Sequence, residues 1–291
     1  MKKKLSRFDF EKMKEAGKMV TWVTAYDYPT ASFVEQAGLD MILVGDSLGM
    51  CVYGYEGTIP VTMDQCIQHC EAVRRAAPNT FVVGDMPFMS YQVSVEDAVR
   101  NAGRFFKEAN VDAIKLEGGV RVCPQIKAIS EGGMLVFGHI GLTPQSSGQL
   151  GGFKAQGRTA PTAMAVIEDA RAVQEAGAFA LLVEAVPPEV TKIIRDELRI
   201  PVYSIGAGIH ADGQLTICSD LLGLFQAFTP KFIKKYENLA EKAIQAFSKY
   251  AEEVRNLEFP LDQHTYKMVE GEYDKLVQLL QSGQAAPNSR F

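Results

Sequence analysis

Short apolar segments alternate with amphipathic segments along most of the chain. The apolar segments are rich in Val, Ile, Leu and Phe and do not alternate cleanly with polar residues, which is typical of strands buried on both faces of a parallel sheet. The pattern predicts seven strands and a weaker eighth, at residues 20–25, 41–44, 81–83, 113–116, 134–137, 180–183, 202–205 and 215–218.

Helix start and stop signals fill the intervals between these strands. Thr62 and Gln65 form a capping box before a helix over residues 66–77. Ser94 opens a second helix, and Pro161 lies at the start of a third. Strands and helices that alternate on this scale indicate βα units, and about eight units in this length favour a closed (β/α)₈ TIM barrel of the α/β class over an open sheet.

The domain organisation follows from the absence of any linker or change of composition. We expect a single catalytic barrel domain over residues 1–265 and a C-terminal helical extension over residues 266–291. Helices are expected near 232–257 and 273–280, and the small polar residues 283–291 are expected to fray.

Two segments do not fit the alternation of strands and helices. Residues 48–60 contain glycines and tyrosines, and residues 143–158 contain four glycines. Long loops that follow barrel strands are commonly lids or binding loops, so we expect both segments to border the functional site.

The composition excludes several classes of function. Of 291 residues, 47% are hydrophobic, and 30 Lys and Arg against 35 Asp and Glu give a formal net charge of −5. This mildly acidic balance argues against nucleic acid as a partner. No apolar run has the length needed to cross a membrane, and no secretory signal is recognisable. Five scattered cysteines are typical of a reducing compartment, so we expect a cytoplasmic protein.

Cys66, His69 and Cys70 are the one group that imitates a metal site. They are three and four residues apart on a predicted helix and would therefore share a face. A structural zinc site needs a fourth ligand of similar type, and no second Cys/His pair is evident. A packed helix face is therefore the favoured interpretation.

Acidic residues fall at the ends of four predicted strands. Asp46, Asp85, Glu117 and Glu184 each come directly after an apolar strand core. The C-terminal ends of barrel strands form the active-site face, so the four carboxylates should converge there. Helix capping would explain one or two of them, but four crowded acids repel one another unless a cation binds. Oxygen ligands without Cys or His favour magnesium over zinc.

Lys115 lies inside an otherwise apolar predicted strand. It is two residues before Glu117, so both side chains should point to the same face. A lysine that points into the barrel needs an anionic ligand or partner, because an unpaired buried ammonium is very costly. A structural Lys–Glu ion pair and an outward-facing lysine remain alternatives.

Three further features are weaker. Ser47 could offer its hydroxyl and N–H to a substrate carboxylate, or could cap a helix. His139 follows a predicted strand, where a neutral, hydrogen-bonded histidine is the common outcome. The Gly-Ala-Gly turn at 206–208 is similar to a phosphate-binding turn, or marks close backbone packing.

Six segments in chain order resemble the ketopantoate hydroxymethyltransferase family, and together they are highly specific. The similarity extends to Phe259-Pro260 and His264-Thr265, and it does not cover the remaining residues. The matching segments are Thr24-Ala25-Tyr26-Asp27, Val44-Gly45-Asp46-Ser47-Leu48-Gly49-Met50, Gly84-Asp85-Met86-Pro87-Phe88, Ile114-Lys115-Leu116-Glu117-Gly118-Gly119, Gly138-His139-Ile140-Gly141-Leu142-Thr143-Pro144-Gln145 and Ile205-Gly206-Ala207-Gly208.

The resemblance implies a (β/α)₈ barrel that makes ketopantoate for pantothenate and coenzyme A biosynthesis. A magnesium-assisted enolisation of 3-methyl-2-oxobutanoate would be followed by attack on the methylene group of 5,10-methylenetetrahydrofolate. The resemblance further implies a homo-oligomer, typically a decamer. It implies metal ligation by Asp46 and Asp85, with Glu117 joining directly or through water. It also implies that Ser47 and Lys115 hold the oxo-acid carboxylate, and that Glu184 is the general base.

Two other functions remain compatible with the residues. One is a related magnesium-dependent carbon–carbon lyase or phosphonomutase that acts on 2-oxo acids, although the Lys-Lys-Cys-Gly-His type of loop expected there is not found. The other is a non-catalytic barrel that serves as a binding module, which would leave the four acids and the lysine unexplained.

Overall fold

A computed structural model describes residues 3–283 and contains one closed barrel of eight parallel strands. Each strand pairs with the next along the chain, and β1 pairs with β8 to close the barrel, as the alternating pattern predicted. The strands are β1 (Val20–Thr24), β2 (Met41–Val44), β3 (Phe81–Asp85), β4 (Ala113–Glu117), β5 (Val136–Gly141), β6 (Ala180–Glu184), β7 (Val202–Ile205) and β8 (Gly213–Thr216).

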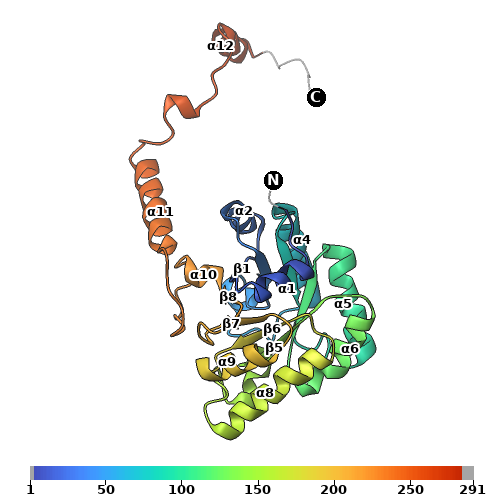
Figure 1. The fold of residues 1–291 in the computed structure, drawn as a ribbon. Helices are drawn as coiled ribbons and strands as arrows, with labels where there is room; N and C mark the ends of the chain where they lie inside the picture. Colours follow the sequence, from blue (N-terminus) through green and yellow to red (C-terminus); the bar gives the residue numbers. More distant parts are fainter. Residues whose placement is uncertain (1–2, 284–291) are drawn as a thin grey trace. The chain divides into compact units, whose positions relative to one another are not determined.

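Helices surround the barrel, and neighbouring helices contact one another around much of its circumference (Figure 1). The capping box predicted at Thr62 and Gln65 is present, and the Ser94 hydroxyl caps the next helix by accepting from the N–H of Asp97. The barrel helices are α1 (Arg7–Glu15), α2 (Tyr28–Ala37), α4 (Met63–Ala76), α5 (Val95–Ala109), α6 (Cys123–Glu131), α8 (Ala160–Glu175), α9 (Pro188–Glu197) and the short α10 (Cys218–Leu221).

Aromatic side chains fill the end of the barrel at which the strands begin. Trp22 packs on Phe137 with ring centroids 5.2 Å apart, and Phe10 of α1 packs edge-on against Phe81 at 5.1 Å. All four are buried. Because these rings fill the end at which the strands begin, the open end lies where the strands finish.

Close contact between a strand and a helix positions one of the predicted acids. A Cβ atom on Gly84 would lie 2.6 Å from the ring of Phe105 in α5. The helix can approach β3 this closely only because the residue before Asp85 has no side chain. Close packing of α5 on β3 therefore requires glycine at position 84, and this contact helps to position Asp85, the next residue.

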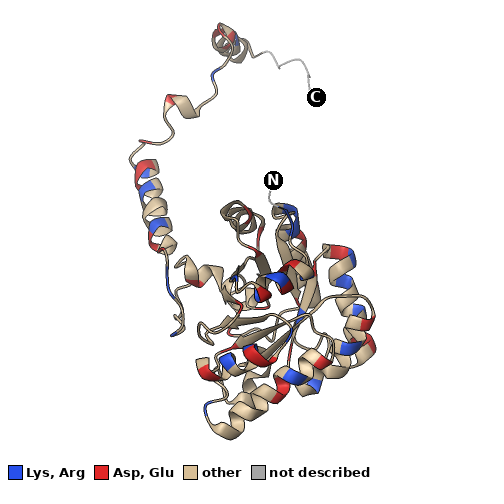
Figure 2. Ribbon diagram, in the orientation of Figure 1, with Lys and Arg blue, Asp and Glu red and all other residues tan. Residues whose placement is uncertain are grey.

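Both long loops contain short helical turns. The loop after β2 begins with α3 (Leu48–Cys51), and the loop after β5 contains a 3₁₀ turn (Pro144–Ser146) and α7 (Ser147–Leu150). Two strands are shifted from their predicted positions: β5 starts and ends later, and β8 starts and ends earlier. Of the others, β1 ends one residue earlier than predicted, and β3, β4 and β6 end one or two residues later. The regions outside the strands carry mixed charge, and Figure 2 shows acidic and basic residues interspersed along α5 and α8.

Internal contacts divide the chain into two compact units, residues 1–238 and 239–291. The second unit contains α11 (Leu239–Arg255), a 3₁₀ turn (Asp262–His264) and α12 (Glu272–Ser282). The division expected after residue 265, between catalytic domain and extension, stays a prediction. Most of the end expected to fray, residues 284–291, lies outside the described residues. No helix of residues 3–283 is long and apolar enough to cross a membrane.

Candidate active site

A cavity of about 980 Å³ lies at the end of the barrel where the strands finish. Its lining includes residues at or just after the C-terminal ends of β2, β3, β4, β5 and β6, together with parts of both long loops. All six residues singled out from the sequence contribute to it, and so does His139. The six are Asp46, Ser47, Asp85, Lys115, Glu117 and Glu184.

Three of the acids form a buried, hydrogen-bonded group. The N–H of Asp46 donates to Oδ2 of Asp85 at 3.0 Å. Asp46, Asp85 and Glu117 are 4%, 1% and 4% exposed. Burial, and then the charges of Asp85 and Glu117, raise the pKa of Asp46 well above its usual value. Burial also raises the pKa of Asp85, although the charge of Lys115 opposes this shift.

Lys115 points into the barrel beside these acids. Its Nζ atom lies 2.8 Å from Oδ1 of Asp85 and 3.7 Å from Oε1 of Glu117. Burial alone would lower the lysine pKa, but the charges of Asp85 and Glu117 outweigh it and raise that pKa. The outward-facing alternative is therefore wrong, whereas the ion pair left open by the sequence is present, with Asp85 as the nearer partner.

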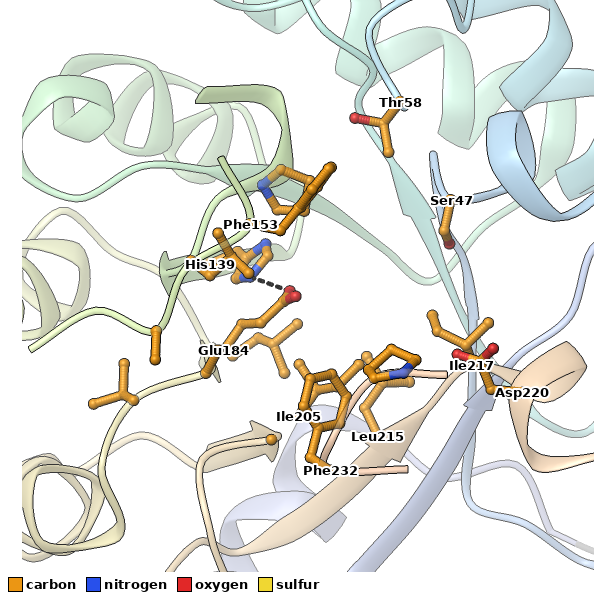
Figure 3. A pocket seen from close by; sticks show the side chains of 18 of the residues that line it. Ser47, Thr58, His139, Phe153, Glu184, Ile205, Leu215, Ile217, Asp220 and Phe232 are labelled. Carbon is orange, nitrogen blue, oxygen red and sulfur yellow. Dashed lines mark ion pairs between the residues drawn. The ribbon is translucent and has the colours of Figure 1, made fainter. Parts of the chain in front are cut away.

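His139 connects two of the acids across the cavity. Its Nδ1 atom lies 3.4 Å from Oε1 of Glu117, and its Nε2 atom lies 3.1 Å from Oε2 of Glu184 (Figure 3). Burial and the charge of Lys115 act against protonation, but hydrogen bonding to Glu117 and Glu184 raises the pKa of His139 to about 9. The position between two carboxylates thus favours the protonated form, whereas the Lys115 ammonium, 3.3 Å from Nδ1, opposes it; the neutral histidine expected from the sequence stays a prediction.

Gln145 is the member of the site that the sequence did not single out. Its side-chain amide donates to Oδ2 of Asp46 at 2.8 Å, and its backbone N–H donates to Oε2 of Glu117 at 3.0 Å. The hydroxyl of Tyr91 donates to its amide oxygen at 2.7 Å. Gln145 is buried and belongs to the loop after β5. A neutral side chain in a loop gives no sequence signal of this kind, although it belongs to one of the family-like segments.

Ser47 lies at the start of α3, where it could have been a helix cap. Its side chain makes no capping hydrogen bond. Instead its hydroxyl shares a hydrogen bond of 2.8 Å with the hydroxyl of the buried Tyr26. This arrangement favours the interpretation in which Ser47 faces a ligand in the cavity.

Two other sequence features have structural roles. Cys66 and Cys70 are buried in the hydrophobic core, and His69 contacts the carbonyl of Tyr26, so this helix face is a packing surface. In the Gly-Ala-Gly turn, a Cβ atom on Gly206 would lie 2.6 Å from the ring of Phe232. The turn is therefore covered by an aromatic ring, and the close-packing alternative accounts for it.

The donor atoms fit a magnesium ion better than a transition metal. Among residues 3–283, no three Asp, Glu, His or Cys side chains are grouped so that they could hold a metal ion by themselves. Magnesium is usually bound by one or two carboxylates, with water and substrate oxygens completing its octahedron. Oδ1 of Asp85 is buried, and its near neighbour is the ammonium of Lys115 at 2.8 Å, so this oxygen retains lone-pair capacity for a further cation. Asp46 and Asp85 thus supply a partial oxygen shell of the type magnesium takes.

Comparisons with known proteins agree with the sequence motifs. The sequence profile of the ketopantoate hydroxymethyltransferase family matches residues 4–262. The 3-methyl-2-oxobutanoate hydroxymethyltransferase of Alkaliphilus metalliredigens is 67% identical over 280 residues, which are 96% of this chain and 99% of the relative. That of Moorella thermoacetica is 54% identical over 255 residues, 88% of this chain and 95% of the relative.

Solved structures support the fold alone. A phosphonopyruvate hydrolase complex with oxalate and Mg²⁺ has a TM-score of 0.58 at 12% identity, covering 96% of this chain and 99% of that one. A 2,3-dimethylmalate lyase has a TM-score of 0.55 at 16% identity, covering 95% and 96%. Since the lyase and phosphonate enzymes share only the barrel, whereas the hydroxymethyltransferases share the sequence, the chain belongs to the ketopantoate hydroxymethyltransferase family.

Proposed function

We propose that this enzyme transfers a hydroxymethyl group from 5,10-methylenetetrahydrofolate to 3-methyl-2-oxobutanoate, which yields ketopantoate in pantothenate biosynthesis. The observation that supports this proposal is the buried group of Asp46, Asp85 and Lys115, which lines the cavity. A separate acid, Glu184 at the end of β6, lines the same cavity. In the balanced reaction, oxo acid, methylene folate and water give ketopantoate and tetrahydrofolate. A C–H bond at C3 is replaced by a C–C bond, and water supplies the new hydroxyl oxygen.

Asp46 and Asp85 are proposed to bind magnesium directly, and Glu117 to join through water. Four carboxylates lie at the strand ends that line the cavity, and among residues 3–283 only Lys115 and His139 form ion pairs with them. Arg158 and Lys231 line the same cavity but are not among these partners. A divalent cation would restore the balance of charge. The chemistry that magnesium supplies when bound is Lewis-acid stabilisation of the negative charge that develops on the keto oxygen.

Lys115 and Ser47 are proposed to hold the carboxylate of the oxo acid. The ammonium is buried among the strand ends and lines the cavity, so it can offer its charge to a small anionic substrate there. The hydroxyl of Ser47 is fixed by Tyr26, so it can donate to the same carboxylate without first losing rotational freedom.

Glu184 is proposed to remove the C3 proton. Its side chain is partly exposed to the cavity, unlike the three metal-side acids, and His139 holds one of its oxygens. A base must be separate from the metal ligands so that it keeps a free lone pair. Glu184 alone among the four acids meets that condition.

The decisive experiment is an assay of ketopantoate formation with and without folate and magnesium. We expect product only when both are present. With magnesium and without folate, the enzyme should still exchange the C3 hydrogen of the oxo acid for deuterium in heavy water. Ketopantoate formation without added folate would contradict the proposal, and so would an absence of exchange. From the family resemblance we also propose a decamer, which sedimentation analysis of the whole chain tests directly.

A further inference from the structure

Asp220 is a buried carboxylate for which the proposed reaction has no use. It lies on α10, directly after β8, is 5% exposed, and lines the cavity. Among residues 3–283 its carboxylate has no hydrogen bond and no ion pair. Lys235 lowers its pKa only from beyond ion-pair distance, and burial outweighs that effect and raises the pKa. A buried polar group without a partner costs free energy, so a ligand with N–H donors would gain by meeting it there.

Aromatic side chains line the same cavity as this carboxylate. The ring of Phe232 lies against Gly206, whose positive φ of 65° and missing Cβ leave room for it. In Figure 3, Phe232 and Asp220 lie on one side of Glu184, and Phe153 lies on the other. Phe153 is 54% exposed, so its ring is available for stacking. A flat heterocycle placed between these rings would lie next to the proposed base.

The cavity is much larger than the oxo acid requires. Its volume of about 980 Å³ is at the upper end of the range for pockets that hold drug-sized ligands. The charge of Asp220 also argues that its neighbourhood does not receive the anionic oxo acid, which Lys115 attracts instead. The part of the cavity around Asp220 is therefore suited to a second substrate that carries a flat, uncharged ring.

We propose that Asp220 and Phe232 bind the amino-pyrimidinone ring of the one-carbon donor, with Phe153 stacking from the opposite side. This inference rests on the proposed function. The ring carries two adjacent donors, its N3–H and its 2-amino group, and they match the two oxygens of one carboxylate in the way that a guanidinium does. Stacking on the aromatic side chains adds affinity and holds the one-carbon unit beside Glu184.

The test is the variant Asp220→Asn, measured against both substrates separately. We expect the KM for 5,10-methylenetetrahydrofolate to rise about 10- to 100-fold, because a charge-assisted pair of hydrogen bonds is lost. The KM for the oxo acid and the rate of its folate-independent deuterium exchange should stay within about twofold of the parent's values, because Asp220 does not bind the oxo acid. Asp64→Asn, which removes an exposed surface carboxylate, is the matched control and should change neither KM.

A donor analogue that lacks the 2-amino group separates recognition from general damage. The parent should discriminate against it, and Asp220→Asn should lose most of that discrimination. Phe232→Ala should also raise the donor KM. Phe33→Ala, which removes an exposed ring of α2, should leave that KM unchanged. An unchanged donor KM in Asp220→Asn, or equal discrimination by parent and variant, would overturn the inference. Failure of the proposed function looks different, since the parent itself would then show no exchange.

Discussion

Buried acids lie at both ends of the barrel, but only those at the start of the strands are balanced by cations. Asp212, just before β8, accepts from Lys14 Nζ and Arg195 Nε, both at 2.9 Å, and from the N–H of Val202. At the other end, within the described part of the chain, Asp85 and Glu117 share a single lysine, Glu117 also meets one histidine, and Asp46 accepts only from the neutral Gln145.

This difference separates stability from function. A buried carboxylate with two cations and a backbone donor holds its surroundings together. A buried group of carboxylates with too few cations is costly by itself, and it is retained where a ligand completes it. The two ends of a (β/α)₈ barrel are known to divide these roles in the same way. Each prediction below tests one end against the other.

The largest effect is expected from Glu184→Gln. Glutamine keeps the shape but accepts no proton, so folate-independent deuterium exchange should fall by about 10²–10⁴ while the oxo acid still binds. NMR of the substrate in heavy water measures the exchange. Glu189→Gln, an exposed acid in the first turn of α9, is the control and should exchange normally. If Glu184→Gln exchanges at the parent's rate yet makes no ketopantoate, Glu184 acts on folate and is not the base.

Asp85→Asn should abolish most activity without lowering stability. Loss of a group that merely supports a metal ligand costs about 10- to 100-fold, so loss of the ligand itself should cost at least about 100-fold. Calorimetric titration should show weaker magnesium binding. The midpoint of thermal unfolding should change little, because relief of the repulsion among three buried carboxylates offsets the lost ion pair with Lys115, which keeps Glu117 as a partner. Unchanged magnesium affinity would remove Asp85 from the metal site.

Asp212→Asn is the same substitution at the other end, and its effect should be reversed. It leaves Lys14 and Arg195 without their shared carboxylate, which should lower the free energy of unfolding by about 3 kcal/mol. Urea denaturation measures this, and kcat of the folded fraction should match the parent. Lys14→Met, a milder change at the same pair, covers the case in which the first variant does not fold. A normal denaturation midpoint together with lost activity would contradict the division of roles.

The smallest effect is expected from Gln145→Leu. This variant removes the amide that holds Asp46, so magnesium affinity should fall about 10- to 100-fold, as for other residues that orient metal ligands. Gln149→Leu alters an exposed residue of the same loop and is the matched control. Equal magnesium affinity in the two variants would show that Gln145 is only a packing residue.

The sequence predicted the barrel and the positions of the acids for the same physical reason. Strands buried on both faces are continuous apolar runs, and the first charged residue after such a run must lie at the end of the barrel; β2 matches its predicted range at both ends. The weak eighth run was placed two residues late because β8 is short and alternates between buried and exposed positions.

Gln145 and Asp220 could not be singled out in this way. Gln145 is uncharged, and its partners come from three other segments of the chain. Asp220 does not directly follow an apolar strand core, since it lies in the short helix α10 after the end of β8. In both cases the local sequence is ordinary, and only the closed fold shows what surrounds the side chain.

The pairing of β1 with β8 also has a consequence for biosynthesis. Val20 lies opposite Gly213, so the barrel closes only after most of the polypeptide has left the ribosome. Until then β1 has an open edge, and the apolar strands of a nascent half-barrel are exposed to other chains. Pairing between such distant segments is intrinsically slow. We therefore expect production of this protein in a foreign host to depend on chaperones and on slow translation more strongly than its ordinary composition would suggest.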